Sequence, residues 1–295
     1  MPAEPSGAPR WADLAPRWPF AQSSRFVQAG GLEWHLQQAG RGPLLLLVHG
    51  TGAATFSFGP LLPFLTGRFT VLAPDLPGHG FTSGANPAHL TLPGMASALS
   101  ALLRHEGLAP AFAVGHSAGA AVLLRLAIDR AISPAGLVGL APALVPPPAV
   151  YRLLFAPLVH RLATTRVVAS SAAALARNDG IIASLLDSTG SAIPPDHLVL
   201  YQRFFRSPQH VADAFAMMSG WSLTELTRDL YKVPCPVTIA AGTADRWIPL
   251  GALRRLAAMI PRLTFTEVAG GHLFHEDRPQ LAAETILAAA DRAGL

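Results

Sequence analysis

The segment AFAVGHSAGAAVLL, residues 111–124, places a serine between two glycines where a strand-like run gives way to a helix-like run. The apolar residues that end at Gly115 are typical of a buried strand, and the Ala- and Leu-rich residues after Ser117 favour a helix. This is the context that the G-x-S-x-G motif requires. We therefore expect a tight, strained turn that lifts the Ser117 hydroxyl above a sheet edge, beside the amide groups of a helix N-terminus.

The sequence on both sides of this segment alternates between strand and helix. Residues 25–40 form two alternating runs about a Gly-Gly pair, which predicts a hairpin. Continuous apolar runs typical of buried parallel strands follow, separated by helix-like stretches. The predicted strands lie within residues 42–50, 68–80, 111–117, 135–142, 235–249 and 262–272, and the predicted helices lie at 92–106, at 118 to about 130 and from about 279. We predict an α/β fold with a mostly parallel central sheet covered by helices on both faces.

One long segment interrupts this alternation. Residues 144–231 show no strand pattern and only helix-like stretches rich in Ala, Leu and Arg. We interpret them as an inserted helical cap over the carboxyl ends of the strands, where ligands bind in such sheets. The core domain is then expected to comprise residues 25–143 and 232–295. The Pro-rich residues 1–24 are expected to form an irregular arm.

A nucleophilic serine needs a base, and the base needs a carboxylate that orients it. His272 follows the last predicted strand on a Gly-rich loop, and Asp245 follows the preceding strand at the same sheet edge. The chain order Ser117, Asp245, His272 is the order in which this architecture carries a catalytic triad. The alternative base is His275, and the alternative role for Asp245 is that of a turn residue.

The oxyanion hole is predicted at two backbone amides. Thr51 follows the first central strand, and its N–H is expected to face that of Ala118 across the substrate oxygen. Asp75 and His79 in the neighbouring loop are expected to hold the shape of that loop. No catalytic role is predicted for six further histidines in helical or polar stretches, which are His35, His89, His105, His160, His197 and His210.

Composition argues against several functional classes. Of the 295 residues 51% are hydrophobic and 14% are charged, which is enough apolar sequence for a substantial core. The net charge is +4, but the basic residues are scattered singly, so no nucleic-acid partner is expected. Cys235 is the single cysteine, and no His/Cys cluster indicates a metal or cofactor. No signal peptide is recognised and turns or prolines interrupt the longest uncharged runs, so a cytoplasmic protein is expected.

The motifs HGTG, DLPGHG, GHSAG, GTAD and GGHLFHEDRP together resemble those of the α/β-hydrolase superfamily, from about Arg25 to the end of the chain. A closer resemblance is to the magnesium-chelatase accessory proteins of bacteriochlorophyll biosynthesis, and it is carried by VHGTGAATFSF, PDLPGHGFT, LPGMASALSALL, VGHSAGAAVLLRLAID and LYQRFFRSPQHVADAFAMMSGW. That resemblance implies a place among the magnesium-porphyrin steps without giving a substrate. A dehalogenase or epoxide hydrolase is not expected, because those relatives carry a carboxylate at the position of Ser117.

The cap is expected to help hold a bulky hydrophobic ligand, with a porphyrin or its ester as candidates. Residues 151–177 carry arginines without acidic neighbours and leucines at every fourth position. Three interpretations remain: a solvated helix face, a site for porphyrin carboxylates, or weak association with the inner or photosynthetic membrane. The residues expected to line the substrate site are Gly50, Gly52, His116, Phe155, Phe204, Met217 and Trp221.

These patterns predict a serine hydrolase that acts on an ester-like bond in a hydrophobic substrate without a cofactor. Ser117 is expected to attack, His272 to move the proton and Asp245 to orient the imidazole. The alternative is a non-catalytic porphyrin-binding accessory or carrier protein for magnesium chelatase. Transfer, ligation and C–C bond hydrolysis also remain open, because one triad supports several acceptors and scissile bonds.

Overall fold

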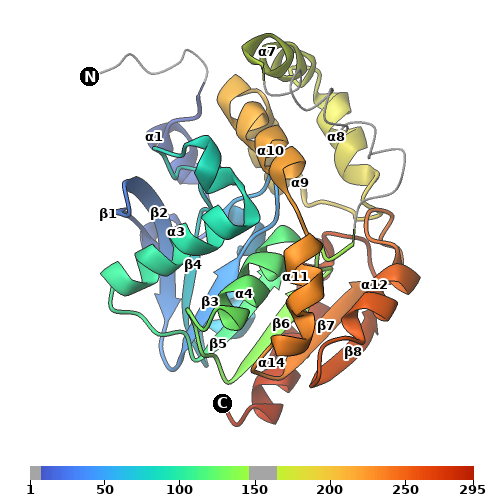
Figure 1. Cartoon of the computed structure of the whole chain (residues 1–295). Coiled ribbons are helices and arrows are strands. Elements are labelled where there is room, and N and C mark those ends of the chain that lie inside the picture. Colours follow the sequence, from blue (N-terminus) through green and yellow to red (C-terminus); the bar gives the residue numbers. More distant parts are fainter. Residues whose placement is uncertain (1–7, 146–164) are drawn as a thin grey trace.

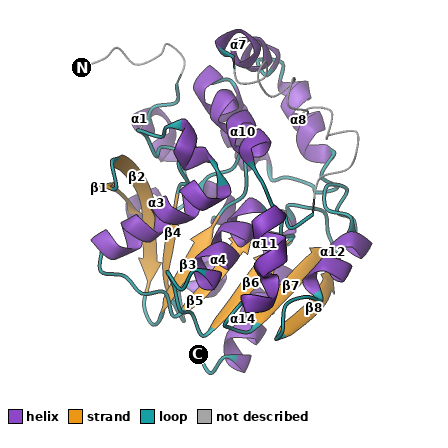
Figure 2. Ribbon diagram, viewed as in Figure 1, coloured by secondary structure: helices purple, strands orange, loops and turns teal. Residues whose placement is uncertain are grey.

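The computed structural model describes residues 8–145 and 165–295 (Figure 1). Eight strands form one sheet in the order β1-β2-β4-β3-β5-β6-β7-β8. Figure 2 shows helices in front of and behind this sheet. The predicted α/β fold class is confirmed.

The alternating runs near the N-terminus form the predicted hairpin. Strand β1 (Ser24–Ala29) pairs antiparallel with β2 (Leu32–Gly40) across Gly30 and Gly31. These two glycines have φ of +61° and +80°, values that two-residue hairpin turns require and that side chains disfavour. Strand β2 also pairs antiparallel with β4 (Thr70–Pro74), so the hairpin forms one edge of the sheet.

Every neighbouring pair from β4 to the far edge is parallel. The further strands are β3 (Leu44–Val48), β5 (Phe112–His116), β6 (Gly136–Leu140), β7 (Val237–Gly242) and β8 (Leu263–Val268). The inner strands are mostly apolar because helices cover both of their faces, and every residue of β5, β6 and β7 is buried, including the polar His116 and Thr238. Parallel strands end at one edge, so the residues that follow them gather there.

Two helical layers cover the two faces, each with its own hydrophobic cluster. The first layer consists of α3 (Leu92–His105), α4 (Ala118–Ile128), α11 (Thr224–Asp229) and α12 (Leu250–Ala257). The second consists of α2 (Leu62–Leu65), α13 (Phe274–Asp277) and α14 (Pro279–Arg292). Helix α3 begins where expected because the Thr91 hydroxyl accepts the Gly94 N–H and Pro93 occupies the first turn.

The described part of the N-terminal arm is helical, which differs from the irregular arm that the sequence predicts. It forms α1 (Trp11–Leu14) and the 3₁₀ turns η1 (Ala15–Arg17) and η2 (Ala21–Ser23). Trp18 is 3% exposed, packs edge-on against Phe56 and donates from Nε1 to Thr55 Oγ1 at 3.2 Å. The prolines set the turns, and the apolar surface that the tryptophan buries holds them against the core.

Between β6 and β7 the described residues form helices and no strand. The cap helices are α7 (Arg166–Leu175), α8 (Asp179–Asp187), α9 (Pro195–Phe205) and α10 (Pro208–Gly220). Figure 1 shows them above the sheet, whereas the following helix α11 packs against α4 in the first layer. Phe155, Arg152 and Arg161 lie outside the described residues, so the predicted arginine-bearing face stays a prediction. Within residues 8–145 and 165–295, every helix is too short or too polar to span a lipid bilayer.

Candidate active site

Ser117 lies on the sharp turn between β5 and α4. Its backbone has φ 49° and ψ −117°, a conformation that residues with side chains rarely adopt and that stores strain. The flanking glycines make room for this turn. A Cβ at Gly115 would lie 2.4 Å from the Ala120 nitrogen, and one at Gly119 would lie 2.1 Å from the Val48 carbonyl oxygen. The G-x-S-x-G spacing is thus a steric requirement of the turn.

His272 lies between Ser117 and Asp245 and contacts both. Its Nε2 is 3.0 Å from Ser117 Oγ, and its Nδ1 is 2.8 Å from Asp245 Oδ2. The side chains of His272 and Asp245 are 4% and 3% exposed, so water competes little for either bond. A neutral imidazole that donates from Nδ1 to the carboxylate presents the lone pair of Nε2 to the serine hydroxyl. The three residues that the sequence selects are therefore brought together with the geometry of a nucleophile, a base and an orienting acid.

Asp245 divides its two carboxylate oxygens between two tasks. Oδ1 accepts the backbone N–H groups of Trp247 and Ile248 at 2.7 and 2.9 Å, which shapes the turn after β7. Oδ2 is left for His272. The Trp247 ring stacks on the His272 ring, with centroids 5.7 Å apart and an interplanar angle of 29°. The role of a turn residue and the role of an orienting acid are compatible here, because each uses a different oxygen.

The predicted oxyanion residues lie on adjoining segments. Ala118 is the first residue of α4, so its amide has no carbonyl partner within the helix. The loop after β3 passes close to the elbow, since a Cβ at Gly50 would lie 2.9 Å from Ser117 Cβ. Thr51 is the next residue along this loop, and its hydroxyl donates to Met217 Sδ at 3.4 Å. Whether these two amides act on an oxyanion stays a prediction.

Buried polar side chains hold the loops around the elbow. His49 donates from Nδ1 to the Gly50 carbonyl oxygen and accepts the Leu76 N–H at Nε2, both at 2.8 Å. Burial lowers the pKa of His49, which favours the neutral ring that this pairing requires.

Asp75 holds the neighbouring loop, as the sequence predicts. Its carboxylate is fully buried and accepts the N–H groups of Thr55 and Phe81 at 2.7 and 2.9 Å, while His35 Nδ1 lies 2.7 Å away. Burial alone would raise the pKa of Asp75, but His35, His49 and the Phe81 N–H together outweigh it and lower the pKa, which favours the charged carboxylate.

Two histidines near His272 are placed away from the reacting atoms. His116 is 2% exposed and donates from Nε2 to the His272 carbonyl oxygen at 3.0 Å, so it holds the backbone of the His272 loop. The sequence predicts His116 at the substrate surface, but the structure buries it. His275 is fully buried against His116, and neither of its ring nitrogens has a hydrogen-bond partner among the described residues. Burial lowers the pKa of His275 to about 3. His272, not the alternative base His275, faces Ser117.

The other residues expected to line the substrate site are mostly interior. Phe204 is 2% exposed in an aromatic cluster between cap and core, and Met217 is completely buried beside Thr51. Trp221 is half-buried and packs on the hydrophobic cluster beneath the first helical layer. Gly52 has φ +76°, and a Cβ there would lie 3.1 Å from the ring of Phe205. Aromatic residues of the cap therefore serve first to pack the cap onto the core.

A buried cluster that the sequence does not reveal joins the cap to the core. Glu276 follows His272 by four residues and is 1% exposed. Its carboxylate contacts His197 Nδ1 at 2.6 Å and accepts the Tyr201 hydroxyl at 2.7 Å, both from α9. The sequence assigns His197 no role because its partner is 79 residues away. The one signal in the sequence is Glu276 itself, a carboxylate four residues after His272 in the motif GGHLFHEDRP.

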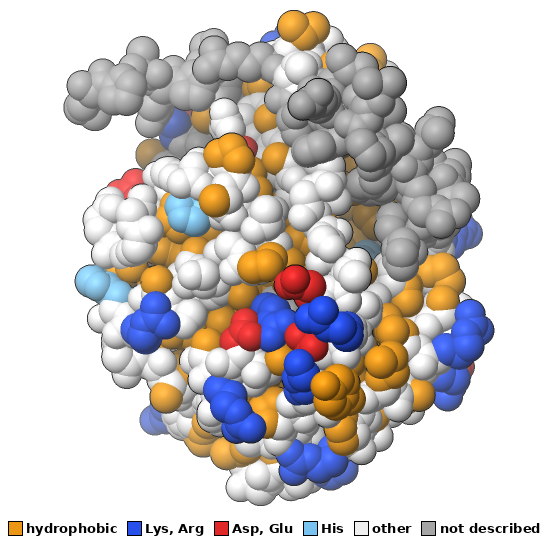
Figure 3. Space-filling model, viewed as in Figure 1, with side chains coloured by type: hydrophobic (Ala, Val, Ile, Leu, Met, Phe, Trp, Pro, Cys, Tyr) orange, Lys and Arg blue, Asp and Glu red, His pale blue; other side chains and the backbone are white. Residues whose placement is uncertain are grey.

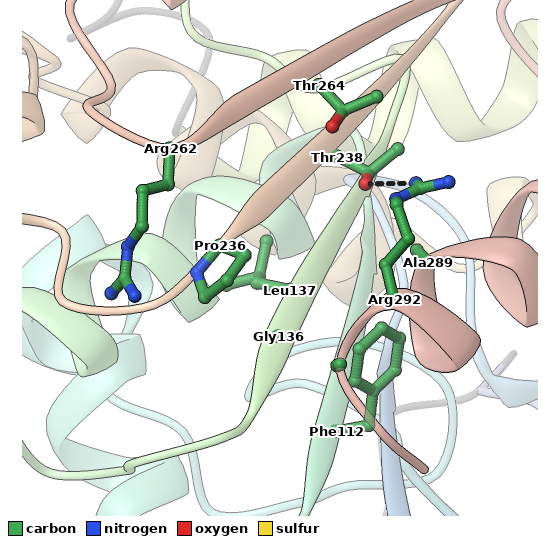
Figure 4. Close-up of a pocket in the computed structure, with 10 residues that line it drawn as sticks. Phe112, Gly136, Leu137, Pro236, Thr238, Arg262, Thr264, Ala289 and Arg292 are labelled. Atoms are coloured by element: carbon green, nitrogen blue, oxygen red, sulfur yellow. Dashed lines mark hydrogen bonds between the residues drawn. The ribbon is translucent and has the colours of Figure 1, made fainter.

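One hollow of the structure lies away from Ser117, Asp245 and His272. Figure 4 shows a hollow of about 280 Å³ at the amino ends of β5 to β8, where Arg292 donates to Thr238 Oγ1 at 3.1 Å. None of the predicted site residues lines it. On the face in Figure 3 basic side chains lie beside acidic ones near the centre, and other basic side chains are spread around them. Asp229 contacts Arg125 and Lys232. Among the described residues, no group of His, Cys, Asp and Glu could hold a metal ion.

Comparisons with known proteins agree with this architecture. The sequence model of the alpha/beta hydrolase family matches residues 45–285. The magnesium-chelatase 30 kDa subunit of Rhodobacter capsulatus is 34% identical over 265 residues, which cover 89% of this chain and 93% of that protein. A 2-(acetamidomethylene)succinate hydrolase of Mesorhizobium japonicum is 25% identical over 276 residues, again covering 89% of this chain and 93% of that protein.

A solved structure bears on the fold alone. An alpha/beta hydrolase fold protein from Burkholderia ambifaria superposes with a TM-score of 0.76 at 23% identity, over 90% of this chain and 97% of that chain. The family match spans both the turn at Ser117 and the loop of His272. The resemblances to alpha/beta hydrolases and to magnesium-chelatase accessory proteins are both confirmed by these matches. The chain belongs to the alpha/beta hydrolase family.

Proposed function

We propose that this protein is a serine hydrolase in which Ser117, His272 and Asp245 form the catalytic triad. The proposal is carried by the position of His272, whose two ring nitrogens lie 3.0 Å from Ser117 Oγ and 2.8 Å from Asp245 Oδ2. A serine hydroxyl is a weak nucleophile until a neighbouring base accepts its proton. Relatives that are named as hydrolases support the reaction class.

The chemistry proceeds in two steps that use the same three residues. Ser117 Oγ attacks the carbonyl carbon of an ester while His272 Nε2 accepts the hydroxyl proton. His272 then donates that proton to the departing alcohol, which leaves an acyl group on Ser117. Water attacks the acyl group, again passing its proton to His272, and the acid and free Ser117 are formed. Asp245 stabilises the imidazolium at both stages.

The oxyanion that forms in each step needs hydrogen-bond donors. We assign this role to the backbone amides of Thr51 and Ala118, which lie on the two segments that adjoin the elbow. Ala118 also contributes the positive end of the α4 dipole. Loss of one such donor costs about 10²- to 10³-fold in rate in hydrolases of this kind.

The surroundings of the triad favour a hydrophobic acyl or alkyl group. Two half-buried aromatic side chains lie at the triad and at a neighbouring loop: Trp247 stacks on His272, and Phe205 of α9 packs over Gly52 in the loop after β3. Rigid aromatic faces bind large apolar ligands better than small polar ones. Together with the 34% identity to a magnesium-chelatase subunit, this supports an ester-bearing intermediate of the magnesium-porphyrin steps as the substrate.

The test is labelling of the purified protein with a fluorophosphonate, which reacts with activated serines, read by intact mass and peptide mapping. The wild type is expected to carry one adduct, on Ser117. Ser117→Ala and His272→Ala are expected to carry none, and both must be shown to fold by circular dichroism. A folded wild type without an adduct would remove the hydrolase proposal.

A second function is favoured by one observation. The Rhodobacter capsulatus protein, which is 34% identical to this chain, is named as a subunit of magnesium chelatase and not as a hydrolase. We therefore propose, as the alternative, a porphyrin-binding accessory protein that uses the same site without turnover. It predicts that wild type and Ser117→Ala bind protoporphyrin with equal affinity while neither hydrolyses an ester. Ester turnover by the wild type alone would decide against this carrier role.

A further inference from the structure

We propose that residues 188–193 of the cap position His272 and Asp245, so that the cap supplies part of the catalytic geometry. These residues, here called the cap connector, join α8 to α9. The proposal rests on the proposed serine hydrolase and adds positioning residues to it. It follows from three sets of contacts between the cap connector and the two loops that carry the base and its acid.

The first set holds the backbone of the histidine loop. The N–H of His272 donates to the Thr189 carbonyl oxygen at 3.0 Å, and the N–H of Leu273 donates to Ser191 Oγ at 2.8 Å. Thr189 and Ser191 are 2% and 5% exposed, so water cannot readily replace them as acceptors. Two successive amides of this loop, including that of the base itself, are therefore bonded to the cap and not to the core.

The second set is direct backbone packing. Gly190 has φ +79°, and a Cβ there would lie 2.1 Å from the carbonyl oxygen of Ala244, the residue before Asp245. A Cβ at Gly271, the residue before His272, would lie 2.2 Å from the Gly190 carbonyl carbon. The cap connector thus lies between the acid loop and the base loop, with glycines at the points of closest approach.

The third set reaches the far side of the acid loop. Trp247, whose own N–H is held by Asp245, donates from its ring Nε1 to Ser188 Oγ at 3.1 Å. The cap connector is in turn anchored, because Glu276 of α13 holds His197 in the first turn of α9 and Tyr201 further along the same helix. The cap connector is therefore bonded to the acid loop through Trp247, and the helix that follows it is bonded to the core through Glu276.

These contacts matter because triad chemistry tolerates little displacement. A shift of about 1 Å in a catalytic group can lower the rate by about 10²-fold. His272 must satisfy Ser117 Oγ and Asp245 Oδ2 at once, so a small rotation of its backbone weakens both bonds together. The cap connector restrains that rotation through the amides of His272 and Leu273.

The experiment compares Ser191→Ala with Ser171→Ala, which removes an exposed hydroxyl from cap helix α7 and serves as the matched control. Two quantities are measured on the full chain. One is the rate constant of fluorophosphonate labelling of the folded protein, with the final extent recorded separately. The other is the low-field proton resonance of the His272 Nδ1–H, assigned by its loss in His272→Ala.

Support requires that Ser191→Ala label about 10- to 100-fold more slowly, to the same final extent, with a shifted or broadened His272 resonance, while Ser171→Ala matches the wild type. If Ser191 only stabilised the fold, Ser191→Ala would lower the final extent of labelling. The labelling rate constant and the His272 resonance of the folded fraction would then be unchanged. An unchanged rate or an unchanged resonance in Ser191→Ala overturns the proposal.

Two further arms keep the outcomes distinct. If Ser191→Ala does not fold, Ser188→Ala, which removes the acceptor of the Trp247 ring, is held to the same criteria. If the wild type itself does not label, the serine hydrolase proposal fails, and the resonance alone then decides whether the cap connector positions His272.

Discussion

Asp245 contacts His272 through a single carboxylate oxygen. Oδ2 lies 2.8 Å from His272 Nδ1, whereas Oδ1 accepts two backbone amides of its own turn. The turn fixes the carboxylate plane and thereby aims the second oxygen at the histidine. Shaping the loop and holding the His272 ring are therefore two functions of one side chain that substitution can separate.

Asp245→Asn is expected to abolish activity while preserving the fold. The amide oxygen can still accept the turn amides, but its NH₂ group then faces His272 Nδ1. That ring nitrogen must accept a hydrogen bond, so the ring proton moves to Nε2 and no lone pair is left for the Ser117 proton. We expect hydrolysis to fall about 10⁴-fold, with a nearly unchanged melting temperature. Asp245→Ala, the control, should lose stability as well; more than a tenth of wild-type activity in Asp245→Asn would contradict this account.

Ser117→Gly is expected to stabilise the protein while removing the nucleophile. Ser117 holds φ 49° and ψ −117°, and such strain costs about 1–3 kcal/mol in a residue with a side chain. Glycine relieves it but loses about 0.5–1 kcal/mol more backbone entropy on folding. The free energy of unfolding should therefore rise by about 1 kcal/mol, measured by urea denaturation. Ser117→Ala retains the strain and is the comparison; equal stability of the two variants would show that the turn is not strained.

Acidification is expected to destabilise the fold below neutral pH. Burial lowers the pKa of His210 to about 4 and that of His275 to about 3, from an ordinary value of 6.5. Both rings stay neutral when folded but take up protons when unfolded, so their contribution is complete above pH 6.5 and is lost as the pH falls toward the folded values. Asp213, whose pKa burial raises to about 6, acts in the opposite sense, since its contribution is lost as the pH rises through that value.

The pH effect can be assigned by substitution of one ring. Urea unfolding of the wild type and of His275→Gln is compared at about pH 7.5 and about pH 5. The variant is expected to lose less stability between the two pH values, because it no longer carries a group that protonates only on unfolding. Parallel losses in the two proteins would exclude His275 as a source of acid sensitivity.

Tyr201→Phe is expected to weaken the attachment of the cap to the core. The Tyr201 hydroxyl donates to the buried carboxylate of Glu276 at 2.7 Å, and hydrogen bonds to charged groups contribute about 1.5–3 kcal/mol. The loss should appear in the free energy of unfolding measured by denaturant. Tyr231→Phe, at a position that is 59% exposed, is the matched control and should change little. Equal effects of the two substitutions would mean that the Glu276 cluster is not an anchor.

The sheet and the elbow could be predicted because their signals are local. The apolar runs predict β3 and β5, and the glycines around Ser117 predict the sharp turn, each from a few neighbouring residues. The chain order of Ser117, Asp245 and His272 adds evidence for the arrangement of the site. These predictions need no information about contacts between residues that are distant in the sequence.

What escaped prediction depends on pairs that are distant in sequence. Glu276 of α13 contacts His197 of α9, a residue 79 positions away in the sequence. The N-terminal arm is held through a similarly distant contact, between Trp18 and Thr55 of the core. His116 illustrates the same limit: its place in the motif is plain from the sequence, but its burial beneath His272 is a property of two loops meeting.

The closeness of Gly190 and Gly271 also has a consequence for protein engineering. Exchange of the cap helices would be one way to change which ligands reach Ser117. Here the two backbones touch without space for a methyl group between them. A transplanted lid would have to bring its own glycine, and an acceptor in place of Ser191, to the same spot. Library design should accordingly vary α7 and α10 and leave the residues between α8 and α9 untouched.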